Sequence, residues 1–223
     1  MKTSRRELMQ VYRRLYRHYD DLHWWPGESP LEISVGAILT QNTAWTNVEK
    51  AIRRLKEAGS LSVRALTRHS HKRLAHMIKP AGYFNVKAHR LKNFISFLQN
   101  RYGGSLRKMF QQDTGRLRDE LLSVNGTGPE TADSILLYAG EKPVFVIDAY
   151  TKRILSRHGL MPYEQSYDEF QQLFMKSIPS NVALYNQYHA MLVNVGKDFC
   201  RSKPLCSNCP LNGWRGVPPL RST

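Results

Sequence analysis

Apolar side chains recur along most of the chain at the three- and four-residue spacing of an α-helix. The clearest start lies at Ser29, where Ser, Pro, Leu and Glu follow in the order of an N-cap, a first helical proline and a glutamate able to close a capping box. The next segment, LEISVGAILT, is too apolar for a surface helix and predicts a helix inside a core. Val48, Ile52 and Leu55 indicate a second helix that stops at Gly59.

The same spacing predicts further helices on both sides of a short extended run, KPVFVID, which ends at Asp148. The sequence shows no pair of alternating strands, no internal repeat and no low-complexity linker, so any division into domains must come from packing. We therefore expect an all-α protein. The predicted stretches cover residues 61–68, 71–79, 86–101, 115–123, 130–140, 149–158, 166–177 and 181–197.

Composition and charge narrow the choice of partner. Hydrophobic residues make up 41% of the chain, which argues against disorder. The longest apolar runs fall short of the roughly 20 residues of a membrane span, and the N-terminus lacks the apolar block of a signal peptide. A net charge of +15 and a pI near 9.9 suit a polyanion. Basic residues spread over many segments disfavour a membrane surface, so we expect a cytoplasmic protein that binds nucleic acid.

Residues 121–140, LLSVNGTGPETADSILLYAG, predict two helices joined by a very short hairpin. Between Val124 and Glu130 the backbone must reverse, and Gly126 and Gly128 supply conformations or close approach that a Cβ would forbid. Exposed N–H groups beside the start of the second helix would suit a phosphate oxygen. An ordinary helical corner, with glycine needed for steric reasons alone, explains the pattern equally well.

The hairpin followed by VFVIDAYTKRIL resembles the helix-hairpin-helix and Gly/Pro-Asp motif of the endonuclease III superfamily of DNA glycosylases. The resemblance extends to LTQNT at 39–43, KPAGYFNVKAHRL at 79–91 and YHAMLVNVGKDFC at 188–200. It implies a two-lobed helical fold with a cleft, and double-stranded DNA carrying a damaged base as the partner of a monomer. The implied lobes are a helical barrel over 31–140, with the hairpin at about 121–140, and a second lobe from 1–30 and 141–223. The implied DNA contacts are Gln41, Asn125, Gly126, Thr127 and Gly128.

In the resembled family, the aspartate at the position of Asp148 is the essential carboxylate that faces the damaged nucleotide. A carboxylate there stabilises the oxocarbenium character that develops on the sugar when the base leaves. Without the hairpin upstream, N-capping of a helix would be the better interpretation of Asp148. The lysine that forms a Schiff base in bifunctional members is matched by Glu130, which cannot act as an amine. The resemblance thus implies a monofunctional enzyme with water as nucleophile, although Lys152 and Lys197 remain candidate amines outside the expected place.

Aromatic residues predict a pocket for a flipped base. Trp24, Trp25 and Pro26 precede the first core helix, and Trp45 follows LTQNT. Core packing explains any one of these tryptophans equally well. Their combination with GYFN and with a residue other than lysine after the hairpin resembles the 3-methyladenine DNA glycosylase III group most closely. An alkylated purine is cationic, so indole faces would attract it, and it leaves readily without a general acid.

Two polar positions in LTQNT have predicted roles. Gln41 matches the family residue that enters the gap left by the flipped nucleotide, where its amide would hydrogen-bond the orphaned base. The alternative is a polar cluster at a helix end. Thr43 is predicted to cap the helix that follows.

Three cysteines, Cys200, Cys206 and Cys209, lie close together near the C-terminus, separated by five and two residues. Many family members end in four cysteines, spaced six, two and five, that bind a [4Fe–4S] cluster. Here Trp214, Arg215 and Gly216 stand where the fourth cysteine is expected. Three outcomes are open: a cluster with another fourth ligand, a zinc site completed by His158 or His189, or a loop without metal.

The sequence predicts a monofunctional DNA glycosylase of base excision repair that flips out an alkylated purine, 3-methyladenine first, and hydrolyses its N-glycosidic bond to leave an abasic site. The alternatives are an endonuclease III-like pyrimidine or mismatch glycosylase with lyase activity, and a non-catalytic helix-hairpin-helix DNA-binding protein. Asp148 argues against the last, because a pure binder has no need of a carboxylate against phosphates.

Overall fold

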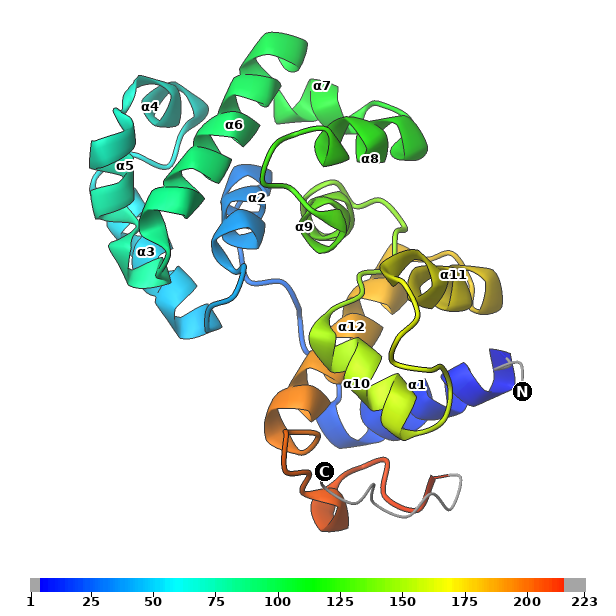
Figure 1. Cartoon of the computed structure of the whole chain (residues 1–223). Coiled ribbons are helices and arrows are strands. Elements are labelled where there is room, and N and C mark those ends of the chain that lie inside the picture. Colours follow the sequence, from blue (N-terminus) through cyan, green and yellow to red (C-terminus); the bar gives the residue numbers. More distant parts are fainter. Residues whose placement is uncertain (1–4, 215–223) are drawn as a thin grey trace. The chain divides into compact units, whose positions relative to one another are not determined.

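A computed structural model describes residues 5–214 of the chain. Within this range every regular element is helical, which confirms the expected all-α class (Figure 1). Among these residues no helix is both long and apolar enough to cross a lipid bilayer.

The chain divides into two compact units. The central unit is Pro26–Lys142, and the terminal unit combines residues 5–25 with 143–214. The central unit holds α2 (Pro30–Leu39), α3 (Trp45–Glu57), α4 (Val63–Arg68), α5 (His71–Met77), η1 (Lys79–Ala81), α6 (Phe84–Tyr102), α7 (Leu106–Phe110), α8 (Thr114–Leu122), α9 (Pro129–Ser134) and η2 (Ile135–Ala139). The terminal unit holds α1 (Arg5–Tyr19), α10 (Ala149–Arg157), α11 (Tyr167–Ser177), α12 (Val182–Asp198) and η3 (Cys206–Asn208).

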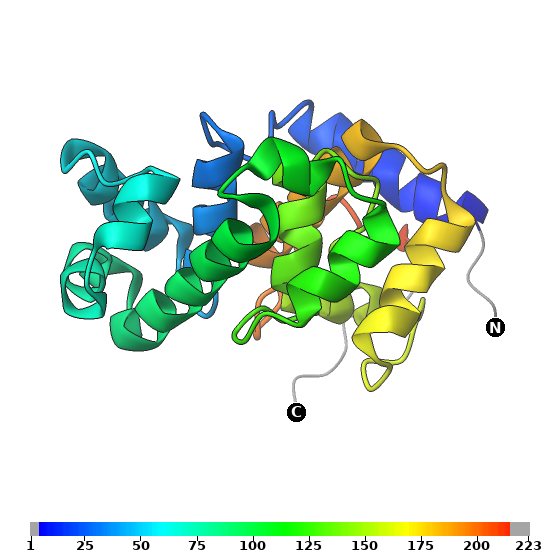
Figure 2. The same ribbon diagram turned by 90° about the horizontal axis from the view of Figure 1, so that it is seen from above.

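The helix α2 forms the centre of the central unit, as its all-round apolar sequence predicts. It contacts α3, α6, α9 and η2; the first three are labelled in Figure 1, and Figure 2 shows the same helices from above. Val35, Ile38 and Leu39 are fully buried in this packing. Because α2 carries no polar face, its stability comes from burial against these neighbours.

The predicted capping box at the start of α2 is only half present. Ser29 Oγ accepts a hydrogen bond from the backbone N–H of Glu32 at 3.2 Å, as expected. The carboxylate of Glu32 accepts instead from the backbone N–H of Glu28 and forms an ion pair with Lys56 of α3 at 2.9 Å. The competing charge on α3 therefore draws the glutamate away from the serine.

One further local prediction is wrong, and one short helix gives no signal in the sequence. Thr43 does not cap α3, because the N-cap is Ala44 and makes no side-chain capping bond. The short helix α7 was not predicted, since five residues carry too little periodicity to be recognised.

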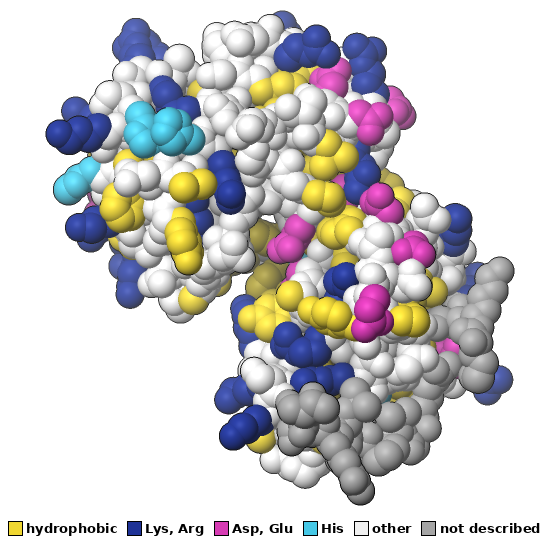
Figure 3. Space-filling view, viewed as in Figure 1, with side chains coloured by type: hydrophobic (Ala, Val, Ile, Leu, Met, Phe, Trp, Pro, Cys, Tyr) yellow, Lys and Arg dark blue, Asp and Glu magenta, His cyan; other side chains and the backbone are white. Residues whose placement is uncertain are grey.

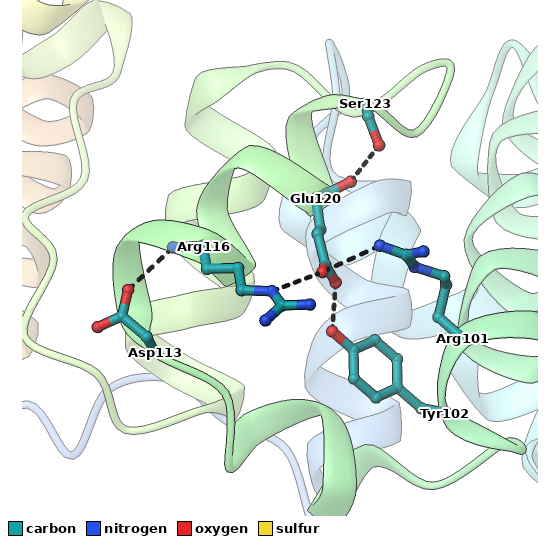
Figure 4. Close-up of polar contacts among 6 residues, drawn as sticks. All are labelled: Arg101, Tyr102, Asp113, Arg116, Glu120 and Ser123. Atoms are coloured by element: carbon teal, nitrogen blue, oxygen red, sulfur yellow. Dashed lines mark hydrogen bonds and ion pairs between the residues drawn. The ribbon is translucent and has the colours of Figure 1, made fainter.

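A polar cluster joins α6 to α8 in the central unit (Figure 4). The Glu120 carboxylate accepts from Tyr102 Oη, from Arg101 Nη2 at 3.2 Å and from Arg116 Nε at 3.3 Å. The hydrogen bond from Tyr102 lowers the pKa of Glu120, although burial opposes this effect. The cluster fixes the helix that leads into the hairpin.

The core of the terminal unit is aromatic. The rings of Phe145 and Phe174 stack with centroids 3.8 Å apart, and Tyr185 and Tyr188 meet Phe145 edge-on. The extended run before Asp148 supplies Phe145, and α11 and α12 supply the other three rings. This packing anchors the end of that run, and therefore the position of Asp148.

Candidate active site

The hairpin lies between α8 and α9 of the central unit. Asn125 is exposed at the tip, whereas Thr127 is buried. Gly126 has a φ of +92°, in the region that favours glycine, and Gly128 has an extended φ of −88° as the N-cap of α9. An ideal Cβ at Gly128 would meet no atom of residues 5–214 within 4 Å, so within this range the backbone there is open to an approaching group. This openness is what a phosphate contact requires.

Gly126 is needed for a second reason that the sequence did not reveal. An ideal Cβ at this position would lie 2.2 Å from Cγ of Arg90, which comes from α6. The stem of Arg90 therefore lies directly against the glycine. Any side chain at position 126 would displace it.

Gln41 is bound to the hairpin. Its Nε2 donates to the carbonyl oxygen of Gly126 at 3.0 Å and to Thr131 Oγ1 at 2.8 Å, and its Oε1 accepts from Arg90 Nη1. The loop after α2 and the hairpin are thus one connected polar site. The sequence predicts DNA contacts for Gln41 and for the hairpin, but it gives no signal for Arg90, whose charge lies next to Gln41 only in three dimensions.

The buried Lys87 of α6 holds the loop that carries Gln41. Its Nζ donates to the carbonyl oxygen of Leu39 at 2.8 Å and to that of Ala81 at 2.7 Å. One ammonium thus connects the last residue of α2 to η1, which directly precedes the GYFN segment at 82–85. Burial lowers the pKa of Lys87 to about 8.

Tyr83, in the turn after η1, is a second candidate site residue for which the sequence alone predicts no role. Its side chain is 73% exposed, and its backbone has a left-handed φ of +44°. The preceding Gly82 would place a Cβ 4.0 Å from Thr43 Oγ1, so this turn lies beside the loop of Gln41. A large exposed aromatic in a strained turn suits stacking on a nucleobase.

Asp148 is the N-cap of α10 in the terminal unit, which was the alternative to a catalytic role in the sequence. Its Oδ1 accepts from the backbone N–H of Thr151 at 2.7 Å. Its Oδ2 lies 3.8 Å from Nε2 of the buried His189, and 11% of the Asp148 side chain is exposed. Capping therefore fixes the carboxylate in one orientation, with part of it accessible. The capping role and a catalytic role are compatible in this geometry.

The two lysines considered as amines are placed differently. Lys152 donates to the carbonyl oxygen of Gln165 at 2.8 Å, and its ammonium lies over the ring of Tyr163. Lys197 Nζ lies 5.5 Å from the centroid of Trp24. Burial lowers the pKa of His189, Asp148 opposes this, and Lys197 lowers it further. Lys197 therefore acts electrostatically on His189, the histidine beside Asp148.

The predicted base pocket draws on both units. Trp24 and Trp25 meet edge-on in the terminal unit with ring centroids 6.0 Å apart, and Trp24 lines a groove of about 460 Å³ with residues of α1 and α12. Pro26 and Trp45 belong to the central unit, where Trp45 Nε1 donates to Glu49 at 2.8 Å. That these four residues form one pocket stays a prediction.

The cysteine loop follows α12. Arg157 Nη1 lies 3.3 Å from Sγ of the buried Cys200, whereas Cys206 and Cys209 are partly exposed around η3. Within residues 5–214 no group of three or more His, Cys, Asp or Glu side chains converges on a metal position. Arg215 and Gly216, at the expected place of a fourth ligand, lie outside the described residues. The three outcomes for the loop, a cluster, a zinc site or no metal, stay predictions.

The two histidines considered as zinc ligands have other surroundings. His158 packs against the ring of the buried Trp214, with centroids 5.6 Å apart, and burial lowers its pKa. His189 lies beside Asp148. The structure thus assigns His189 to the neighbourhood of the carboxylate.

A helix-hairpin-helix, followed by an N-capping aspartate at the end of an apolar run, defines a DNA glycosylase fold. Residues 35–180 match the HhH-GPD superfamily of base excision DNA repair proteins. A Methanocaldococcus jannaschii protein, provisionally named a DNA repair glycosylase, is 46% identical over 95% of this chain and 97% of its own length. The endonuclease III of Thermotoga maritima is 25% identical over 92% of this chain and 86% of its own.

Solved structures agree with this relationship. The H. pylori 3-methyladenine DNA glycosylase, in complex with 1,N6-ethenoadenine, is 28% identical and covers 86% of this chain and 95% of its own, with a TM-score of 0.73. An endonuclease III trapped as a covalent DNA intermediate has a TM-score of 0.79 at 22% identity and 93% coverage of both chains. The present chain therefore belongs to the HhH-GPD superfamily and is a DNA glycosylase of base excision repair.

Proposed function

We propose that this chain is a monofunctional glycosylase that removes an alkylated purine, with 3-methyladenine as the first candidate, from double-stranded DNA. The observation that carries the proposal is the fixed carboxylate of Asp148 combined with Glu130 at the position of the lyase lysine. The resemblance to the H. pylori 3-methyladenine glycosylase supports the choice of base. Because Glu130 offers no amine, water is the nucleophile and an abasic site is the product.

The residues divide the work in a simple way. The open backbone at Gly128 and the hairpin around it bind a phosphate without reading sequence. Lys and Arg side chains are scattered over the visible face rather than gathered in one stripe, which suits non-specific attraction of a duplex (Figure 3). Gln41 occupies the gap left by the flipped nucleotide, and Tyr83 stacks on a base beside that gap. Trp24 contributes an indole face for the flipped base.

Asp148 performs the chemical step. As the bond between sugar and base breaks, positive charge develops on the sugar, and the preoriented carboxylate stabilises it. A cationic alkylpurine leaves as a neutral base, so no general acid is needed. Burial keeps His189 neutral near pH 7, so that it does not compete as a cation for the carboxylate.

Base release tests this function directly. Methylated duplex DNA is incubated with the protein, and the released bases are identified by chromatography. Asp148→Asn is expected to reduce release by a factor on the order of 10² to 10³ or more, because the amide keeps the shape but loses the charge. Release of no modified base, or full activity of Asp148→Asn, would contradict the proposal.

A second candidate, a glycosylase with lyase activity, is favoured by one observation. Lys197 lies over Trp24 and acts electrostatically on His189, which is itself the neighbour of Asp148. Borohydride trapping on a duplex with an abasic site separates the candidates. We expect no covalent adduct, whereas an adduct that disappears in Lys197→Ala but not in Lys152→Ala would establish the lyase.

A further inference from the structure

The amide of Gln41 has no spare donor in the DNA-free protein. Both Nε2 hydrogens are used, one by Gly126 O and one by Thr131 Oγ1, and Oε1 accepts from Arg90. A glutamine in this state cannot donate to an orphaned base. If Gln41 enters a gap in DNA, it must first leave the hairpin.

Arg90 is a cation whose partner in the protein is neutral. Within residues 5–214 its guanidinium makes one hydrogen bond, to Gln41, and no ion pair. Its stem lies against Gly126, which places the charged head at the hairpin itself. Of its five N–H donors, four therefore remain for another acceptor at the loop where a phosphate is expected.

We propose that Arg90 is a switching residue that positions Gln41. Without DNA it holds Gln41 on the hairpin. When a duplex binds, the guanidinium moves to a backbone phosphate and Gln41 is released toward the orphaned base. The inference rests on the proposed function, because only a flipped nucleotide leaves a gap to fill.

Charge sets the direction of this exchange. A guanidinium–phosphate bond is charge-assisted on both sides, whereas the bond from Arg90 to the Gln41 amide is charge-assisted on one side only. DNA therefore competes successfully for Arg90. Gln41 then loses the only bond that its Oε1 accepts from residues 5–214, and the two bonds from Nε2 to Gly126 and Thr131 are left to be exchanged for bonds to a base. The hairpin contact and the insertion of Gln41 become one coupled event.

The first test is the salt dependence of DNA binding. The full chain is titrated by anisotropy into a duplex that carries a tetrahydrofuran abasic analogue, at about 50 to 200 mM salt. Arg90→Met keeps the stem over Gly126 but removes the charge, and should lower the slope of log K against log salt by about 0.9, the value for one phosphate. Arg90→Lys should keep the slope. Arg64→Met, which removes an exposed arginine of α4, is the matched control and should also keep it.

The second test is a double-mutant cycle on the same duplex. In the wild type, insertion of Gln41 into the gap requires breaking its bond with Arg90. Gln41→Ala therefore loses only the free energy of the contacts with DNA minus that of the bond with Arg90. In the Arg90→Met background that bond is absent, and the loss of affinity caused by Gln41→Ala should be greater by roughly tenfold. A purely structural role of Arg90 would leave the two losses equal.

The outcomes separate the inference from the function it rests on. An unchanged salt slope in Arg90→Met or an additive cycle overturns the switch, even if the wild type releases alkylated bases. A reduced slope with a non-additive cycle, but no base release from methylated DNA, retains the switch and overturns the glycosylase proposal. Circular dichroism checks folding, and Arg90→Gln replaces Arg90→Met if the latter unfolds.

Discussion

Gly126 and Gly128 impose different requirements on the hairpin, although both read as turn glycines in the sequence. Gly126 combines a φ of +92° with the stem of Arg90 at the place that a Cβ would occupy. Gly128 has an ordinary extended φ of −88° and open space where a Cβ would point. Gly126 is therefore required for the conformation and packing of the protein itself, and Gly128 for the approach of a DNA phosphate.

The two glycines consequently predict opposite effects of alanine. Gly126→Ala should lower the free energy of unfolding by about 1 to 3 kcal/mol, because a Cβ is strained there and displaces Arg90. Gly128→Ala should change it by less than about 1 kcal/mol but weaken binding to undamaged duplex, since the methyl group covers the phosphate site. Urea unfolding and anisotropy measure the two effects. Equal stability losses in both variants would contradict this division of roles.

Lys87 offers a test of a buried charge. Its pKa is about 8 in the folded state and 10.5 when exposed, because burial disfavours the ammonium. Between these values the unfolded chain binds the proton and the folded chain does not, so the Lys87 contribution to stability rises with pH. The wild type should therefore gain stability relative to Lys87→Met between pH 8 and 10.5, as measured by urea unfolding. A constant difference across this range would mean that Lys87 titrates normally.

Glu120 tests the connection between α6 and α8. The hydrogen bond from Tyr102 lowers the pKa of Glu120, so the ionised carboxylate stabilises the fold above pH 4.5, and this contribution is lost as the pH falls through the lowered folded-state pKa. Glu120→Gln should lower the free energy of unfolding by about 1 to 2 kcal/mol at pH 7. This loss of unfolding free energy should become smaller as the pH is lowered. Urea unfolding or thermal unfolding without guanidinium measures it. Tyr102→Phe should give part of the same loss, since it removes the principal donor.

Helices with a strong period or a clear end signal could be predicted from sequence alone. The apolar α2 and the periodic α3 and α6 follow from side-chain spacing, and the glycines at 59 and 140 lie at predicted ends. The capping roles of Glu32 and Thr43 could not be predicted, because a lysine on another helix and a shift of one residue decided them. Short-range rules fail where a partner distant in sequence competes.

The candidate site shows the same division. Asp148 and the hairpin carry sequence signals, since an aspartate after an apolar run and closely spaced glycines are recognisable without a structure. Arg90, His189 and the buried Lys87 carry none, because each gains its role from a neighbour at least forty residues away or from burial. Their contribution depends on packing, which a one-dimensional pattern does not contain.

At the scale of the whole molecule, the net charge of +15 governs the affinity of the chain for DNA. The base pocket governs which base is selected. Phosphate contacts release counterions and are therefore weakened by salt. Contacts to a base or to the orphaned partner involve the neutral groups of Gln41 and the tryptophans, and release none. The charge thus sets affinity, and uncharged contacts set discrimination.

This separation predicts how salt affects the two kinds of binding. Between about 50 and 200 mM salt, affinity for undamaged duplex and for a duplex with an abasic analogue should fall in parallel, each by several powers of ten if six to ten phosphates are contacted. Their ratio should fall by a factor of about four at most, the effect of the single phosphate contact of Arg90, because the other contacts that distinguish the two duplexes are neutral. Anisotropy titrations on both duplexes across the same salt series measure this ratio. A ratio that collapses toward one at high salt would show that a charged side chain, with Lys197 the first to replace by alanine, recognises the lesion itself.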